Sequence, residues 1–253
     1  MLVDSHAHIY SEYYDNINNI IDMAKKNNVL KIVNCATSIS NMDEVIKLSK
    51  KFDFYYALGV HPEDASAFDE RIKNIINTFI KKSVNDKNFV AIGEIGLDYH
   101  YDNLNKEKQK ELFDFQLSLA EKYNKSVIIH SRDATLDTIN ILRKYKVKGV
   151  IHCFSGSYET AIEYIKMGYK LGIGGLVTFK NCNLKNYIKK IGIGNILLET
   201  DSPYMTPEPF RGKKNEPKYV IETAKFLTNI LDISLEKLEE ITTKNFQEIF
   251  DIK

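Results

Sequence analysis

The stretch Leu2-Val3-Asp4-Ser5-His6-Ala7-His8 says most about the fold of this chain. It opens with apolar and β-branched residues, which are typical of a short strand buried on both faces of a parallel sheet. A Rossmann-type sheet would place a glycine-rich turn directly after such a first strand. Here the strand runs into His6, Ala7 and His8 instead, and this argues against a Rossmann or flavodoxin-like sheet.

Seven similar runs follow along the chain, with amphipathic stretches between them. We expect strands at 2–5, 31–35, 55–59, 90–94, 126–130, 149–153, 170–174 and 196–199. We expect helices at 17–27, 43–51, 69–82, 106–123, 136–145, 158–167, 184–191, 218–231 and 235–250. This alternation indicates a parallel sheet built from βα units, and eight strands favour closure. The prediction is therefore an α/β fold of the (β/α)8 TIM-barrel class, as a single domain over residues 1–253.

Bulk composition fits such a fold and sets limits on function. The chain has 253 residues, of which 43% are hydrophobic and 27% charged, so it can bury a large core. The net charge of +1 does not indicate a strongly basic nucleic-acid binder, although a local basic patch could suffice.

The expected compartment follows from the cysteines and from the first residues. Cys35, Cys153 and Cys182 form no CxxC pair, which argues against a disulfide framework and a zinc knuckle and favours a reduced compartment. The N-terminus has no signal-peptide pattern, and no apolar run approaches the roughly 20 residues that span a bilayer. We expect a cytoplasmic monomer that does not associate with membranes.

Residues that can bind metal ions recur at the ends of the expected strands. The set comprises His6, His8, His61, Glu94, His130, His152 and Asp201. In a barrel the carboxyl ends of the strands meet on one face, where active sites are built. The pattern therefore predicts a metal centre assembled from residues that are distant in the sequence.

His6 and His8 define the first part of this centre. Residues i and i+2 of a strand point to the same side, so both imidazoles can hold one cation. An isolated pair of this kind would more often be one core and one surface histidine, but the other ligand-type residues reverse that preference. Asp201 completes this set or acts as a general base, and Glu199 could orient a ligand or a water from behind it.

Glu94 defines the second part. It follows four apolar or glycine residues, where a carboxylate is unfavourable unless it is paired or bound to metal. An ion pair with Arg132 is one alternative, but we assign Glu94 as a bridge between two cations. With His130 and His152 it makes a nitrogen-rich second set, which suits divalent first-row ions. Two ions about 3.5–4 Å apart can activate a water and stabilise the attacking and leaving oxygens, with Glu94 and Asp201 as the catalytic residues.

Several longer motifs now point to a known family. They are Asp4-Ser5-His6-Ala7-His8, Gly59-Val60-His61-Pro62, Gly93-Glu94-Ile95-Gly96-Leu97-Asp98-Tyr99, His130-Ser131-Arg132-Asp133-Ala134, His152-Cys153-Phe154-Ser155-Gly156 and Leu198-Glu199-Thr200-Asp201-Ser202-Pro203-Tyr204, together with Gln109, Gln116, Leu117 and Ala120 between the third and the fourth. Over essentially its whole length, the chain resembles the TatD family of metal-dependent deoxyribonucleases, within the amidohydrolase-like superfamily.

The resemblance implies an activity and a ligand set. The activity is hydrolysis of phosphodiester bonds by a metal-activated water, often from the 3′ end of single-stranded DNA, with two divalent ions (Mg²⁺, Mn²⁺ or Zn²⁺). One ion would be held by His6, His8, Glu94 and Asp201, and the other by Glu94, His130 and His152. His61 resembles a pocket residue that contacts a phosphate or helps to hold a further ion.

Basic and aromatic residues could bind the DNA substrate. Arg132 and Arg211 could neutralise phosphates, whereas Lys213 and Lys214 fit a solvated basic loop almost equally well. The aromatic rings that could stack on bases are Tyr99, Tyr101 and Phe179, although such rings more often simply line the mouth of a barrel.

Two other functions stay open at this point. The same metal centre could hydrolyse another ester or amide, as in a D-aminoacyl-tRNA deacylase, because activity on a given fold depends on its loops. A metal-stabilised interaction protein without activity is the third hypothesis, and the full ligand set argues against it.

Overall fold

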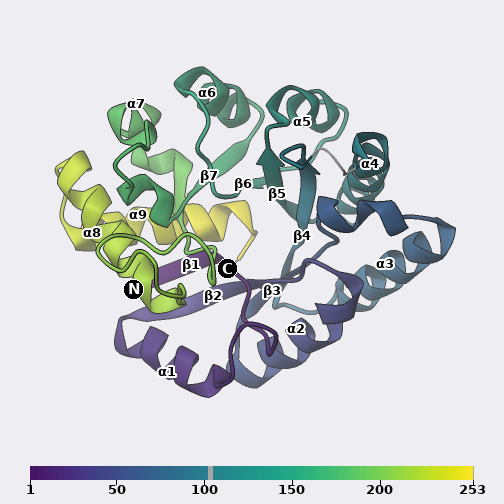
Figure 1. Ribbon diagram of the computed structural model, residues 1–253, viewed down its shortest axis with the longest axis horizontal. Coiled ribbons are helices and arrows are strands. Elements are labelled where there is room, and N and C mark those ends of the chain that lie inside the picture. Colours follow the sequence, from purple (N-terminus) through teal and green to yellow (C-terminus); the bar gives the residue numbers. More distant parts are fainter. Residues whose placement is uncertain (102–104, 253) are drawn as a thin grey trace. The chain divides into compact units, whose positions relative to one another are not determined.

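The computed structural model of the chain describes residues 1–101 and 105–252. Within these residues the chain divides into two compact units. One comprises residues 1–34 and 152–253, here called the terminal unit, and the other comprises residues 35–151, here called the central unit. Strands and helices alternate through both units, as Figure 1 shows.

The terminal unit is built on parallel strands that bring the two ends of the chain together. Strand β1 (Leu2–Ala7) pairs with β2 (Val29–Cys35), and β7 (Tyr169–Ile173) pairs with β8 (Ile196–Leu198). A parallel bridge between Ala7 and Ser202 links the end of β1 to the segment that follows β8.

Helices with well-defined caps surround these strands. The terminal unit contains α1 (Ile17–Lys26), α6 (Tyr158–Lys166), the short α7 (Ile188–Ile191), α8 (Val220–Leu231) and α9 (Leu235–Ile249). The side chains of Ser157 and Ser234 accept backbone N–H groups at the starts of α6 and α9, which stabilises these helix ends. Asn245 of α9 donates to the carbonyls of Ile193 and Ile196, and so fastens the helix to the start of β8.

The central unit contains four consecutive parallel strands. They are β3 (Tyr55–Leu58), β4 (Phe89–Asp98), β5 (Ser126–Arg132) and β6 (Gly149–Ile151), and each pairs with the next. Its helices are α2 (Ile39–Phe52), α3 (Glu70–Ser83), α4 (Lys106–Tyr123) and α5 (Thr135–Leu142), which lie along one side of these strands in Figure 1. All ten residues of β4 are buried, as expected for a strand covered on both faces.

All eight expected strands are present, but four of them, β1, β2, β4 and β5, are longer than predicted. The predictions that Glu94 ends the fourth strand and that His130 ends the fifth are wrong, because pairing of β4 with β5 continues from Ile95↔Ile129 to Asp98↔Arg132. Gly96 permits this continuation: its φ is +147°, and a Cβ there would collide with the carbonyl of His130. Glu94 and His130 therefore lie inside the sheet.

Two helix predictions also need correction. The stretch expected as one helix at 184–191 consists of a 3-10 turn (Leu184–Asn186) and α7, which are separated by the non-helical Tyr187. The helix expected at 136–145 ends at Leu142. The organisation of residues 1–253 as one domain stays a prediction.

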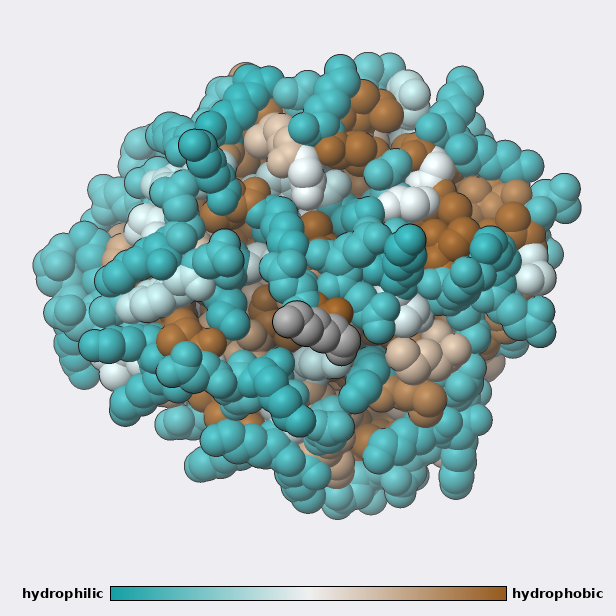
Figure 2. All heavy atoms as spheres, turned by 180° about the vertical axis from the view of Figure 1, so that it is seen from behind, coloured by the Kyte–Doolittle hydropathy of each residue, from teal (hydrophilic) through white to brown (hydrophobic). Residues whose placement is uncertain are grey.

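The outer surface is largely polar. Figure 2 shows hydrophilic side chains over most of one face, with hydrophobic ones in separate smaller areas. In the described part of the chain, none of the helices has the length and apolar character needed to cross a membrane.

Candidate metal centre

His6, His8 and Asp201 come together in the terminal unit. His6 lies in β1, His8 just beyond it, and Asp201 follows β8. Two backbone hydrogen bonds set their register: Asp201 N–H donates to the His6 carbonyl at 2.9 Å, and His8 N–H donates to the Ser202 carbonyl at 2.8 Å. The two Nε2 atoms are 3.1 Å apart, and Asp201 Oδ1 lies 3.6 Å from that of His6 and 3.5 Å from that of His8.

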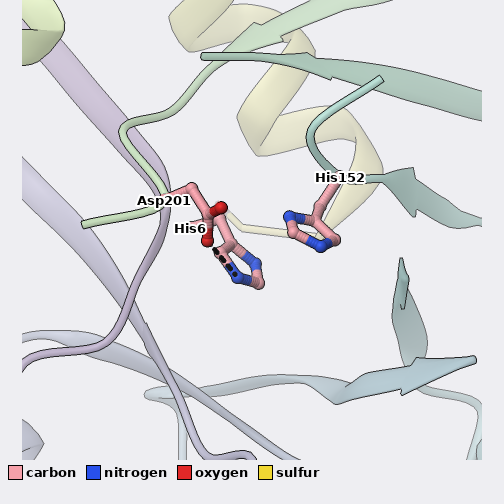
Figure 3. A group of neighbouring side chains, drawn as sticks. All are labelled: His6, His152 and Asp201. Carbon is pink, nitrogen blue, oxygen red and sulfur yellow. Dashed lines mark ion pairs between the residues drawn. The ribbon is translucent and has the colours of Figure 1, made fainter. Parts of the chain in front are cut away.

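His152 joins this group from the end of β6. Its ring stacks on His6 with centroids 4.1 Å apart, and Figure 3 shows both rings beside the Asp201 carboxylate. One nitrogen or oxygen atom from each of His6, His152 and Asp201 can be chosen so that all lie within 4.8 Å of one another. We call His6, His8, His152 and Asp201 the terminal cluster.

The distances in the terminal cluster fit a bound cation. Zinc holds nitrogen and oxygen ligands at about 2.0–2.1 Å, so neighbouring ligand atoms of a tetrahedral site are about 3.3–3.4 Å apart. The three separations between His6, His8 and Asp201 bracket this value. Burial would raise the pKa of Asp201, but the hydrogen bond from His8 and the nearby charges of His152 and His6 outweigh it and lower the pKa below its usual value. The Asp201 carboxyl group is therefore held in its anionic form, which is the form that can bind a divalent ion.

Two buried carboxyl groups, those of Asp4 and Glu199, support the backbone next to the terminal cluster. Asp4 accepts hydrogen bonds from Thr200 N at 2.8 Å and Thr200 Oγ1 at 2.6 Å, which fastens β1 to the residue before Asp201. Burial raises the pKa of Asp4 to about 8, although its hydrogen bonds with Thr200 act in the opposite direction.

Glu199 supports His152 in a similar way. Its Oε1 accepts the N–H of Cys153 at 2.5 Å and lies 3.8 Å from His152 Nδ1. Cys153 has a φ of +47°, an uncommon conformation for a residue with a side chain, and this hydrogen bond helps to stabilise it. Glu199 lies close to His152, and its role in orienting a ligand or a water stays a prediction.

His61, Glu94 and His130 form a second group, in the central unit, that we call the central cluster. Glu94 Oε1 lies 3.0 Å from His130 Nδ1 and 3.7 Å from His61 Nε2. The Glu94 side chain is only 3% exposed, so it needs compensating positive charge from histidine or a metal ion. His61 Nδ1 accepts the N–H of Glu63 at 3.3 Å, so in the neutral ring Nε2 carries the proton and suits donation to an oxygen.

Asp98 orients His130. The sequence patterns did not predict this role. Its Oδ2 lies 2.9 Å from His130 Nε2, which leaves Nδ1 facing Glu94. A carboxylate that fixes one nitrogen of a histidine while the other faces a metal ion is common in metal sites. Hydrogen bonds from His130 and from the His100 N–H, with the charge of Arg132, outweigh burial and lower the pKa of Asp98.

Two buried glutamines of α4 hold the backbone around the central cluster. Gln109 accepts from Asp98 N at 2.8 Å and donates to Asp98 O at 2.7 Å, and Gln116 forms the same pair of bonds with Val60 at 2.8 and 3.0 Å. Val60 precedes His61, so each glutamine fixes the peptide of a residue at or beside this cluster. Both glutamines lie in the matched motifs, but their spacing alone does not reveal this function.

The residues expected to bind substrate differ in their exposure and in their contacts. Arg132 is half exposed, 4.0 Å from Asp98 Oδ2, with its guanidinium 5.5 Å from the centre of the Tyr101 ring. Arg211 lies 4.2 Å over the ring of Phe179, within the terminal unit. Tyr99 donates its hydroxyl to Asp137, which gives it a structural contact.

Comparisons with known proteins agree with this fold and with a metal-dependent hydrolase. YabD of Bacillus subtilis (strain 168), described as an uncharacterized metal-dependent hydrolase, is 41% identical over the full length of both chains. The crystal structure of YJJV, a TatD homolog from Escherichia coli K12, has a TM-score of 0.93 and 28% identity, and covers 100% of this chain and 98% of that one. An uncharacterized amidohydrolase from Saccharomyces cerevisiae has a TM-score of 0.87 at 19% identity, over 98% of this chain and 99% of that one, which supports the fold alone.

These findings place the chain in a class. It is a metal-dependent hydrolase with an α/β fold of eight parallel strands, of the TIM-barrel type, as predicted. More narrowly, residues 3–251 match the family model described as TatD related DNase, and the chain belongs to that family.

Proposed function

We propose that the protein is a deoxyribonuclease that removes nucleotides from the 3′ end of single-stranded DNA, as a monomer in the cytoplasm. The charges of the segment after Asp201 support the choice of a phosphate-bearing substrate. This segment's three cations Arg211, Lys213 and Lys214 form no ion pair with an acidic group in residues 1–101 and 105–252. Positive charges without acidic partners, in the segment that follows a candidate metal-binding residue, suit an anionic backbone.

The chain's own residues would divide the work between the two clusters. In this proposal His6, His8 and Asp201 hold one divalent ion, and Glu94 and His130 hold another. Bound divalent ions supply a nucleophile from water and stabilise the charge that develops on phosphate oxygens. That Glu94 is shared by both ions is a proposal from the sequence alone.

His152, His61 and the arginines complete the proposal. The sequence assigns His152 to the ion held by His130, whereas its stacking on His6 suits the terminal cluster. His61 would donate from Nε2 to a substrate oxygen. Arg132 and Arg211 would bind phosphates, and Arg132 can offer two parallel N–H groups to one of them.

The test is hydrolysis of 5′-end-labelled single-stranded DNA by the purified protein with Mg²⁺, Mn²⁺ or Zn²⁺. We expect metal-dependent shortening that EDTA stops and that Glu94→Ala abolishes. Glu111→Ala, on the exposed side of α4, is the matched control and keeps the activity. A ladder that shortens step by step from the 3′ end supports the polarity. Absence of shortening with every metal would overturn the deoxyribonuclease proposal, and D-aminoacyl-tRNA and small esters or amides would be tested next.

A further inference from the structure

Tyr204 is an exposed aromatic residue that is nevertheless held in place. It comes three residues after Asp201, and 49% of the residue is exposed to solvent. Its hydroxyl donates to the hydroxyl of Tyr13 at 2.9 Å, and the two rings pack edge to face with centroids 5.8 Å apart. Tyr13 in turn packs on the buried Tyr10 at 5.0 Å. Tyr204 therefore presents an aromatic ring to solvent, and its contacts with Tyr13 restrict the motion of that ring.

This ring adjoins the terminal cluster. The ring of Tyr204 packs edge to face against that of His8, with centroids 6.3 Å apart, so a base on Tyr204 would lie next to this histidine. Asn215, which is fully buried, donates from Nδ2 to the carbonyls of both Tyr204 and Thr200, at 2.6 and 2.8 Å. One side chain therefore fixes the tyrosine and the residue before Asp201 together.

A positive charge lies beside the same tyrosines. Lys214 donates to the carbonyl of Tyr13 at 2.6 Å, and its Nζ is 5.6 Å from the centre of the Tyr14 ring. In the described part of the chain it has no acidic partner. Aromatic faces combined with cations that follow the backbone are the usual means by which proteins bind single-stranded nucleic acid.

We propose that Tyr204, supported by Tyr13, stacks on an unpaired nucleobase whose own phosphate lies at the ion that His8 and Asp201 would hold, while Lys214 neutralises a neighbouring phosphate. The inference rests on the proposed deoxyribonuclease function and deepens it by naming what the site recognises beyond phosphate. A base inside a duplex has both faces covered by its neighbours, so this contact selects single strands or frayed 3′ ends.

The experiment compares two strands that differ only at the 3′-terminal nucleotide, which either carries its base or is abasic. The proteins are the wild type, Tyr204→Ala and Tyr204→Phe. Tyr123→Ala is the matched control, because the hydroxyl of Tyr123 also donates to a side chain, that of Asn77, on the outer helices. We expect the wild type to favour the base-bearing strand by about tenfold in kcat/KM, since stacking on one base contributes about that factor.

Tyr204→Ala should remove this preference by slowing cleavage of the base-bearing strand alone. Tyr204→Phe, which keeps the ring, and Tyr123→Ala should retain the preference. An equal loss on both strands in Tyr204→Ala, or no preference in the wild type, would overturn the stacking proposal.

A separate readout distinguishes failure of the deoxyribonuclease proposal. If the wild type cleaves neither strand, fluorescence anisotropy measures binding of the same two labelled strands in the presence of Mn²⁺. Tighter binding of the base-bearing strand that is lost in Tyr204→Ala supports stacking without the nuclease activity. Equal binding of both strands refutes stacking as well.

Discussion

The terminal and central clusters consist of similar candidate ligand residues, but different contacts position these residues. His6, His8 and Asp201 are set by backbone hydrogen bonds between β1 and the segment after β8, and Asp4 reinforces that link through Thr200. His61 and His130 depend on side chains, namely the carboxylate of Asp98 and the carboxamides of Gln109 and Gln116. The terminal cluster is also more enclosed: the side chains of His6 and His8 are 0% and 4% exposed, against 14% and 17% for His61 and His130.

The difference teaches where single substitutions should act. Candidate ligands set by main-chain pairing depend little on any single supporting side chain. Ligands set by side chains can be loosened one support at a time.

The largest effect is expected for Asp201→Asn. This change removes the only carboxylate of the terminal cluster, and with it charge compensation for a divalent ion. We expect hydrolysis of single-stranded DNA to fall by at least about 10³-fold, since a bound ion contributes several kcal/mol to stabilising the transition state. Asp22→Asn, on the exposed side of α1, serves as control. Activity within a few-fold of wild type would show that the terminal cluster is not the centre of the reaction.

The next effect is expected for Asp98→Asn. An amide can still donate to or accept from His130, but it no longer supplies a negative charge behind the ring. Affinity for Mn²⁺ or Zn²⁺ at the central cluster should fall about 10- to 100-fold, as for other supports of metal-binding histidines. Isothermal titration calorimetry should show one weakened and one unchanged site. Equal weakening of both sites would contradict the assignment of Asp98 to the central cluster alone.

A smaller effect, on stability, is expected for Gln109→Leu and Gln116→Leu. Each change leaves a buried N–H and a buried C=O without their partners. Each should lower the free energy of unfolding by about 1–3 kcal/mol for every group left unsatisfied, measured by urea denaturation. Gln247→Leu, on the exposed side of α9, should change it little. Unchanged stability in both α4 variants would mean that water replaces the carboxamides.

The smallest effect concerns how the stability of the fold depends on pH through Asp137, which contacts Tyr99 and Lys110. The hydrogen bond from Tyr99 and the contact with Lys110 lower the pKa of Asp137 below its ordinary value. A carboxyl group with a lowered folded-state pKa stabilises the fold above its unfolded pKa of about 3.9, and this contribution is lost as the pH falls through the folded-state value.

Asp137→Asn should therefore reduce stability at pH 7, and this loss should shrink as the pH falls towards 2. The loss should stay below about 1 kcal/mol, because the group is partly exposed and solvent screens its partners. Thermal melts of the wild type and the variant across this range measure it. A variant that loses equal stability at both pH values would contradict the assignment.

Much of the fold could be read from the sequence because its signals are local. Each expected strand is a short apolar run, and every one of the eight is present. The ends of β4 and β5 were missed because Glu94 and His130 look like terminators, whereas their burial depends on pairing between strands. No local pattern reports that pairing.

The candidate site was only partly legible. His6, His8 and Asp201 come together as predicted, since strand ends and residue types sufficed. The sequence patterns did not predict the roles of Asp98, Gln109 and Gln116. Gln109 contacts Asp98 across 11 positions of sequence, and Gln116 contacts Val60 across 56. The stacking of His152 on His6 likewise depends on how β6 leads into the following turn, which single-residue patterns do not specify.

The link between Asp4 and Thr200 has a consequence for synthesis of the chain. These residues are 196 positions apart, so the terminal cluster can close only once the chain has been synthesised past Asp201. Residues 35–151 form one continuous stretch, and His61, Glu94 and His130 are all present well before translation ends. A growing chain releases its folding units from the N-terminus onward. A truncated product that ends before Asp201 would therefore carry His61, Glu94 and His130 without Asp201, and metal capture at the terminal cluster would report synthesis past that residue.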